Sequence, residues 1–288
     1  MGNSLTNDSR PDRLEATGAH LSWSAAGIIR SNSSLEQLWT NRNDPDLDEY
    51  GDETGGLVGA LSDFAWDAVT FQYHSGRLSE PEAPSLFAED VQAITDMVGL
   101  IDAHQPASKP TIYVYEGWVQ RSKQADWVAE EVVTDATQTG RSRDYSDALV
   151  AALRAELVGY EIGVVPTGDA FYNAFVAIES GDVPGVTDGL DLYRDPTHAS
   201  FDLGRYVAHM TTFATLSQTY PDPALFPEAG YPGAIRAIPL DTRTALSEIV
   251  WDTVTARSDA LVPEPGVVAV IGAALGLGVL RRRVCAAG

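Results

Sequence analysis

Short runs of β-branched and aromatic residues alternate with helix-length segments over most of the chain, and this alternation limits the possible folds most strongly. The runs have the composition of buried strands, and the longer segments space apolar residues three or four positions apart, as amphipathic helices do. In order, the predicted strands and helices occupy residues 66–72, 88–104, 111–115, 145–157, 161–165, 168–179 and 203–216. Strands separated by helices of this length favour a mostly parallel sheet covered on both faces. The sequence therefore predicts an α/β fold, arranged as a three-layer α/β/α sandwich.

The first part of the chain has a less regular pattern. A short helix is predicted at residues 11–18, strand-like stretches within residues 20–29, and another helix after Ser34, whose hydroxyl is a good N-cap. Residues 41–55 are expected to form a solvated acidic loop. Their alternating aspartates look like the opening of a calcium loop, but Glu49 stands where that loop needs its glycine.

The length and composition allow one full-sized hydrophobic core. The chain has 288 residues, of which 44% are hydrophobic. We expect one domain over residues 1–240, a connecting segment over residues 241–261 and a C-terminal tail over residues 262–288. The tail is the clearest boundary, because its composition changes abruptly.

Charge and cysteine content argue against several classes of function. A formal charge of −22 makes the surface repel nucleic acid, so no nucleic-acid partner is expected. The single cysteine, Cys285, lies in the tail. No disulfide within the chain and no zinc site built on thiolates are therefore expected.

The tail combines a turn, an apolar run and a basic cluster. Residues 262–266 read Val-Pro-Glu-Pro-Gly, which interrupts regular structure. The uncharged run at 267–280 is shorter than the roughly 20 residues of a spanning helix, and three arginines at 281–283 end it. The alternative, a core helix with a basic cap, fits this Gly- and Ala-rich run poorly. The arrangement resembles the PEP-CTERM sorting signal, which implies export to the cell envelope or beyond, a transient membrane anchor and processing by an exosortase-type enzyme.

The N-terminus shows no signal peptide, since no charged leader followed by an apolar run precedes the body. A C-terminal sorting signal requires an export signal. We therefore expect the true start of the gene to lie further upstream, with an in-frame segment that encodes a leader and a short apolar strand.

Two polar segments carry the residue types of an acyl-transfer site. Residues 2–8 place Ser4 in a small, glycine-containing turn before a helix, and Asp195 precedes His198 by three positions on a loop. An aspartate at that spacing can orient an imidazole and leave its second nitrogen able to accept a proton from a serine. Parallel sheets collect such loops at the carboxyl ends of their strands.

The residues Gly-Asn-Ser-Leu-Thr at positions 2–6, together with Asp-Pro-Thr-His at 195–198, resemble the first and last blocks of SGNH (GDSL-like) hydrolases, in the GNS variant. The resemblance spans roughly residues 2–216. It implies a flavodoxin-like fold in which Ser4 is the nucleophile, His198 the base and Asp195 its orienting partner. In that fold the nucleophile follows the first central strand. Only Met1 precedes Gly2 here, so we expect this strand to be missing from the sequence.

The resemblance also implies an oxyanion hole, and here the sequence departs from the family. Ser33 or Ser34 stands where the second block has glycine, and Gln72 stands where the third block has asparagine. We expect a serine N–H and the Gln72 amide to replace these donors. His74 either lines the pocket or is a structural histidine.

The resemblance implies an exported serine esterase that acts on O-acyl esters, with acylated extracellular polysaccharide as the substrate class. Such chemistry needs no cofactor and no metal. The alternative is a non-catalytic cell-surface or matrix protein that retains the fold, which the altered second and third blocks favour.

Overall fold

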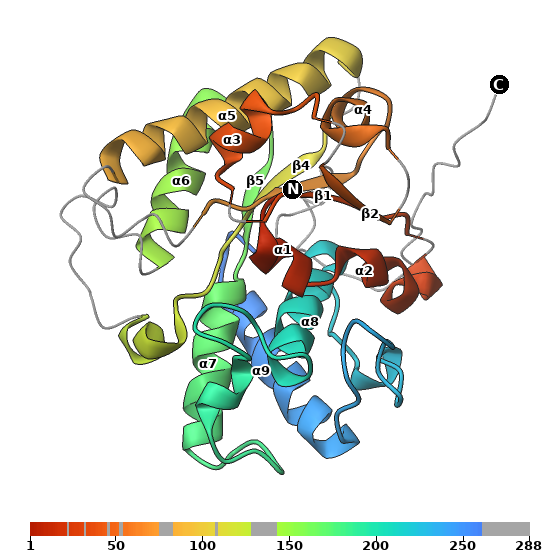
Figure 1. Cartoon of the computed structure of the whole chain (residues 1–288), viewed down its shortest axis with the longest axis vertical. Coiled ribbons are helices and arrows are strands. Elements are labelled where there is room, and N and C mark those ends of the chain that lie inside the picture. Colours follow the sequence, from red (N-terminus) through yellow and green to blue (C-terminus); the bar gives the residue numbers. More distant parts are fainter. Residues whose placement is uncertain are drawn as a thin grey trace, which may run out of the picture.

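The computed structural model describes residues 1–260, except residues 22, 32, 45–46, 52–53, 75–82, 107–108 and 128–142. It is an α/β protein with a small, mostly parallel sheet, and helices lie on both sides of the strands (Figure 1). The predicted sorting signal at residues 262–288 lies outside the described residues.

Three parallel strands form the main sheet, in the order β3-β4-β5. They are β3 (Ala68–Phe71), β4 (Thr111–Tyr115) and β5 (Ile162–Val165). All three were predicted from the sequence, and β4 has the predicted bounds. Their β-branched and aromatic side chains are largely buried, which agrees with a parallel sheet covered on both faces.

A second sheet pairs β1 (Ala26–Ile29) with β2 (Asp48–Gly51) in antiparallel fashion. The expectation that residues 41–55 form only an acidic loop was wrong at β2. The sequence Asp-Glu-Tyr-Gly lacks a strand signature, but among the described residues β2 pairs with β1 alone. Backbone pairing at a sheet edge tolerates charged side chains, so the local pattern concealed this strand.

Met1 and Gly2 lie between the two sheets. The N–H of Gly2 donates to the carbonyl of Ile28 at 3.1 Å, and the N–H of Arg30 donates to the carbonyl of Gly2 at 3.0 Å. On the other side, Met1 nitrogen donates to the carbonyl of Thr70 at 2.5 Å, and Gln72 N–H donates back to Met1 at 2.9 Å. Met1 and Gly2 therefore form backbone hydrogen bonds to both β1 and β3, as a strand between them would.

One group of helices lies on one side of the strands (Figure 1). They are α3 (Leu35–Thr40), α4 (Gly56–Ser62), α5 (Ala83–His104) and α6 (Arg143–Glu156). Helix α5 packs against α3, α4 and α6. Ser34 caps α3 as predicted: its hydroxyl accepts from the N–H of Gln37, and the Gln37 side chain accepts from the N–H of Ser34.

The other side carries α7 (Thr167–Glu179), α8 (Leu203–Ser217) and α9 (Leu240–Ala256), which pack against one another. The expectation of a connecting segment at residues 241–261 was wrong, because α9 belongs to the packed fold. Its buried face includes Arg243, which donates to the carbonyl of Phe226 at 2.5 Å, and Ser247, which bonds the Tyr206 hydroxyl at 2.8 Å. These hydrogen-bonded polar residues interrupt the apolar stripe by which sequence reasoning finds a helix.

Two short helices complete the N-terminal part: α1 (Ser4–Asp8) and α2 (Pro11–Thr17). Short 3₁₀ helices occupy Ala19–Leu21, Arg121–Asp126, Gly189–Leu192 and Pro223–Leu225. Within the described residues, no helix combines the length and apolar character needed to cross a membrane.

Candidate active site

Ser4 is the first residue of α1 and comes two positions after Gly2, which lies with Met1 between the two sheets. Asn3 is the N-cap of this helix, and its side-chain oxygen accepts from the N–H of Leu5 at 3.1 Å. The amide nitrogen of Asn3 reaches the carbonyl of Ser33 at 3.5 Å. The serine is thus held at the carboxyl end of the strands, where α/β proteins place functional groups.

Gly2 allows the close approach that brings Ser4 to this position. A Cβ atom at residue 2 would lie 2.1 Å from Oγ1 of Thr6 and 2.8 Å from Cβ of Gln72. Neither atom is the flexible end of a long side chain. A glycine is therefore required where the chain turns from the sheet into α1.

The structure brings Ser4, His198 and Asp195 together. Oγ of Ser4 lies 3.0 Å from Nε2 of His198, and Nδ1 of His198 lies 2.9 Å and 3.1 Å from the two carboxylate oxygens of Asp195. The side chains of His198 and Asp195 are 30% and 40% exposed, so the site opens to solvent. With Nδ1–H donating to the carboxylate, Nε2 is the acceptor for the serine hydroxyl.

The Asp195 carboxylate is kept in its ionised form. Partial burial on its own raises the pKa of Asp195, but hydrogen bonds from the N–H groups of His198 and Thr197 and from the His198 ring lower the pKa overall. Both backbone bonds are 2.8 Å long. An ionised Asp195 orients the imidazole and stabilises the imidazolium that forms when Nε2 accepts a proton.

Trp118 fixes the loop that carries the aspartate and the histidine. Its indole N–H donates to the carbonyl of Thr197 at 2.8 Å. The Trp118 ring is buried and stacks on Phe171, with ring centroids 4.3 Å apart and an angle of 7° between the planes. The loop is thereby tied to a rigid aromatic pair between the sheet and α7.

Asp8 links α1 to the other half of the site, a role that sequence reasoning missed. This fully buried carboxylate accepts from Nη1 of Arg194 at 2.9 Å, from Nε of Arg205 at 3.0 Å and from the N–H of Ala199 at 3.0 Å. Arg194 and Ala199 flank the Asp195–His198 loop. The one available signal was the position of Asp8, one helical turn after Ser4, which places both on the same side of α1.

Two of the predicted oxyanion N–H groups already have hydrogen-bond partners within the chain. The N–H of Ser34 donates to the Gln37 side chain at 3.0 Å as part of the helix cap. The N–H of Ser33 points to the carbonyl of Arg30 at 3.3 Å. The N–H of Ser4 has no acceptor among the described residues, since it opens α1.

Gln72 lies beneath α1 and holds it through its side-chain oxygen. Oε1 of Gln72 accepts from the N–H of Thr6 at 2.9 Å, from the Thr6 hydroxyl at 2.6 Å and from the N–H of Asn3 at 3.4 Å. The residue is fully buried, and its Nε2 has no hydrogen-bond partner among the described residues. His74 is only partly buried, and it takes no part in the hydrogen bonds that join Ser4, His198 and Asp195.

A second cluster of charges lies beyond the end of β4 but is separate from the triad. Glu116 accepts from the Ser146 hydroxyl at 2.7 Å and from the N–H of Asp169 at 3.1 Å, and Arg257 lies 3.5 Å away. Burial, followed by the charge of Asp169, raises the pKa of Glu116 to about 8. Arg257 also pairs with Asp169 at 2.7 Å, so the cluster fastens the end of α9 to the sheet.

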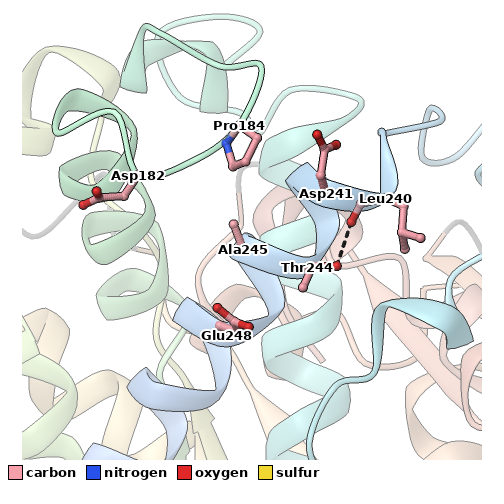
Figure 2. Close-up of a pocket in the computed structure, with 7 residues that line it drawn as sticks. All are labelled: Asp182, Pro184, Leu240, Asp241, Thr244, Ala245 and Glu248. Atoms are coloured by element: carbon pink, nitrogen blue, oxygen red, sulfur yellow. Dashed lines mark hydrogen bonds between the residues drawn. The ribbon is translucent and has the colours of Figure 1, made fainter.

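A surface depression of about 680 Å³ lies at the start of α9, away from the triad. Figure 2 shows its lining residues, among them the acidic side chains of Asp182, Asp241 and Glu248. Within the described part of the chain, no group of His, Cys, Asp and Glu side chains is arranged to hold a metal ion. The residues that line the depression include no histidine, so it has no counterpart of the base of the triad.

The fold and the site together define an α/β protein with a hydrogen-bonded Ser-His-Asp triad at the carboxyl ends of its strands. Proteins of unrelated folds use this constellation for acyl transfer. No protein family, no curated protein and no solved structure matches the chain.

Proposed function

We propose that this protein is a serine hydrolase that cleaves O-acyl esters. The observation that carries the proposal is the chain of hydrogen bonds from Ser4 through His198 to Asp195, with heavy-atom distances of 3.0 Å and 2.9 Å. A nucleophile, a base and an orienting carboxylate within hydrogen-bond reach are the three parts that acyl transfer needs.

The reaction proceeds through a covalent acyl-enzyme. Oγ of Ser4 attacks the acyl carbon while Nε2 of His198 takes the hydroxyl proton. The tetrahedral intermediate collapses, the C–O bond to the alcohol breaks, and the imidazolium returns the proton to the leaving alcohol. Water then attacks the acyl-serine with the same histidine as base, which releases the acid and restores Ser4.

Oxyanion stabilisation rests on fewer prearranged donors than the SGNH resemblance implies. The N–H of Ser4 is available at the start of α1. The Nε2 group of Gln72 is a buried donor that has no partner among the described residues, so a small shift of α1 on substrate binding would let it donate. A buried donor without an acceptor is costly, which favours such a role over a purely structural one.

The finer assignment follows the sequence resemblance. The chain is an SGNH (GDSL-like) hydrolase with a three-layer α/β/α sandwich, and helices on both sides of the parallel sheet agree with this architecture. The PEP-CTERM-like tail directs it to the cell envelope, anchors it transiently in the membrane and is processed by an exosortase-type enzyme. The substrate is an O-acyl group on an extracellular carbohydrate.

The test is ester hydrolysis by wild type, Ser4→Ala and a control variant, Ser180→Ala, which removes an exposed serine at the end of α7. We expect hydrolysis of short-chain activated esters by wild type and Ser180→Ala. We also expect both to be labelled covalently by a fluorophosphonate probe. Ser4→Ala should lose turnover and labelling, and hydrolysis that survives this change would refute the assignment of the nucleophile.

The second candidate is a non-catalytic cell-surface or matrix protein of the same fold. It is favoured by the N–H groups of Ser33 and Ser34, both of which already donate hydrogen bonds within the chain. Folded wild-type protein that neither hydrolyses esters of several acyl chain lengths nor reacts with the fluorophosphonate would decide for this alternative.

A further inference from the structure

Three arginines surround the ring of Phe201, which lies three positions after His198. Their guanidinium carbons lie 4.8 Å, 4.6 Å and 5.3 Å from the ring centroid for Arg194, Arg205 and Arg236. The ring is 38% exposed, so this arginine cluster, made of the three arginines and Phe201, reaches the surface. The cation–π attraction between the ring and the guanidinium groups offsets part of the electrostatic repulsion among the three arginines.

The positive charges of the cluster exceed the negative charges that pair with them. Arg194 and Arg205 share the buried carboxylate of Asp8, at 2.9 Å and 3.0 Å. Asp195 lies 3.7 Å from Nε of Arg194. The guanidinium of Arg236 is exposed and forms no hydrogen bond or ion pair with the described residues. Positive charge thus remains uncompensated at one place on a chain whose formal charge is −22.

The cluster adjoins the triad directly. The N–H of Arg194 donates to the carbonyl of His198 at 3.1 Å, and the N–H of Arg236 donates to the carbonyl of Phe201 at 2.6 Å. Arg236 is therefore fixed by its backbone to the segment that follows the catalytic histidine. A group bound by Arg236 would therefore lie near Phe201, three positions after His198.

We propose that the arginine cluster binds a carboxylate of the substrate, and that the substrate is an O-acylated polyuronate rather than a neutral acylated polysaccharide. This inference rests on the proposed esterase function and specifies its substrate class. A guanidinium presents a planar pair of donors that matches a carboxylate, and Arg236 keeps its donors for a ligand. Because the chain as a whole carries a formal charge of −22, it repels a polyanion, and a cluster with excess positive charge is a favourable place for one to bind.

The test compares two substrates of equal length, O-acetylated oligogalacturonides and O-acetylated xylo-oligosaccharides, which are neutral. We expect wild type to have the higher kcat/KM on the anionic series, through a lower KM. Arg236→Ala should reduce the ratio of anionic to neutral kcat/KM roughly threefold to tenfold, as for a partly exposed charged contact. Arg236→Lys should retain part of the preference, and salt at about 0.5 M should weaken it.

Arg42→Ala is the matched control, because Arg42 also lies over an aromatic ring, that of Trp39, at 4.4 Å. It should leave the ratio at the wild-type value. Equal wild-type kcat/KM on the two series, or an equal fall of the ratio in Arg42→Ala and Arg236→Ala, would overturn the proposal.

A binding experiment separates this inference from the proposed function. Calorimetric titration of wild type and Arg236→Ala with deacetylated oligogalacturonide requires no turnover. Wild-type binding that weakens in Arg236→Ala would support the anionic site even if no ester were hydrolysed. Ester hydrolysis without any oligogalacturonide binding would uphold the esterase and reject the anionic site.

Discussion

Nη1 of Arg194 donates to both carboxylate oxygens of Asp8, at 2.9 Å and 3.1 Å. Asp8 ends the short helix that begins with Ser4, and Arg194 immediately precedes Asp195. The ion pair therefore joins the helix that carries the nucleophile to the loop that carries its base. Because Asp8 is fully buried and also accepts from Arg205, its charge is compensated on both sides.

Replacing Asp8 with asparagine should loosen the contact between Ser4 and His198. We expect kcat on an activated ester to fall on the order of 10-fold to 100-fold, because a displacement of about 1 Å between the serine hydroxyl and the imidazole already slows proton transfer and attack. Stability should also fall, by about 3 kcal/mol, since the buried Arg205 and the partly buried Arg194 lose their carboxylate. Steady-state kinetics and urea unfolding measure the two effects. Asp12→Asn, which removes a partner of Arg10 away from the triad, should keep wild-type kcat, and equal loss in both variants would contradict this role for Asp8.

Gln72 can be tested by a change that keeps its acceptor and removes its donor. Gln72→Glu retains an oxygen for the N–H and hydroxyl of Thr6 but replaces Nε2. If Nε2 stabilises the oxyanion, kcat should fall roughly 10²-fold to 10³-fold while KM changes little. Gln72→Met removes both groups and should also lower the unfolding free energy. Wild-type kcat in a folded Gln72→Glu protein would limit Gln72 to holding α1.

Gly2→Ala should displace the nucleophile. The added methyl group would lie 2.1 Å from Oγ1 of Thr6, so α1 must shift away from the sheet. We expect a loss of stability of about 1–3 kcal/mol, as for other overpacked sites, and a larger relative fall in kcat than in binding. Thr6→Ala removes the clashing oxygen, so the double variant should regain part of the stability. Additive losses in the double variant would show that the clash is not the cause.

His209 should make the fold sensitive to acid. The buried ring bonds the carbonyl of Ser9 at 2.8 Å and the Thr17 hydroxyl at 2.7 Å, and burial lowers the pKa of His209 from 6.5 to about 4. The unfolded chain therefore binds more protons than the folded chain between pH 6.5 and 4. The stabilising contribution is complete above pH 6.5 and is lost as pH falls toward 4, by about 3 kcal/mol at most.

Thermal or urea unfolding across this pH range measures the effect. His209→Gln should show a shallower fall in stability between pH 6.5 and 4 than wild type does, although it is less stable at neutral pH. His20→Gln changes an exposed histidine and should keep the wild-type slope. Identical slopes for wild type and His209→Gln would assign the acid sensitivity to other groups.

The sequence pattern correctly predicted the three parallel strands, whose buried residues are apolar or aromatic. Strand β4 has five residues of high β propensity, and its bounds were predicted correctly. Helix α9 was missed because Arg243 and Ser247 are buried with hydrogen-bond partners, so its sequence lacks a continuous apolar face. Strand β2 was missed because an edge strand with acidic residues has the composition of a loop.

The candidate triad was accessible to sequence reasoning because serine, aspartate and histidine are chemically distinctive and because Asp195 and His198 are close in the chain. The support beneath it was not accessible. Asp8 is separated from Arg194 by 186 positions and from Arg205 by 197 positions, and nothing near any of the three residues indicates the others. The engagement of Ser34 in a helix cap also depends on whether α3 begins there.

The hydrogen bond between Ser4 and His198 spans 194 positions of the chain. On a ribosome the serine emerges long before the histidine, and closing so long a loop costs conformational entropy that only the completed core repays. A nascent or truncated chain should therefore carry an inert serine. During refolding, fluorophosphonate labelling should therefore recover later than the helical circular dichroism signal. The rate at which labelling recovers would report when the two ends of the fold come together.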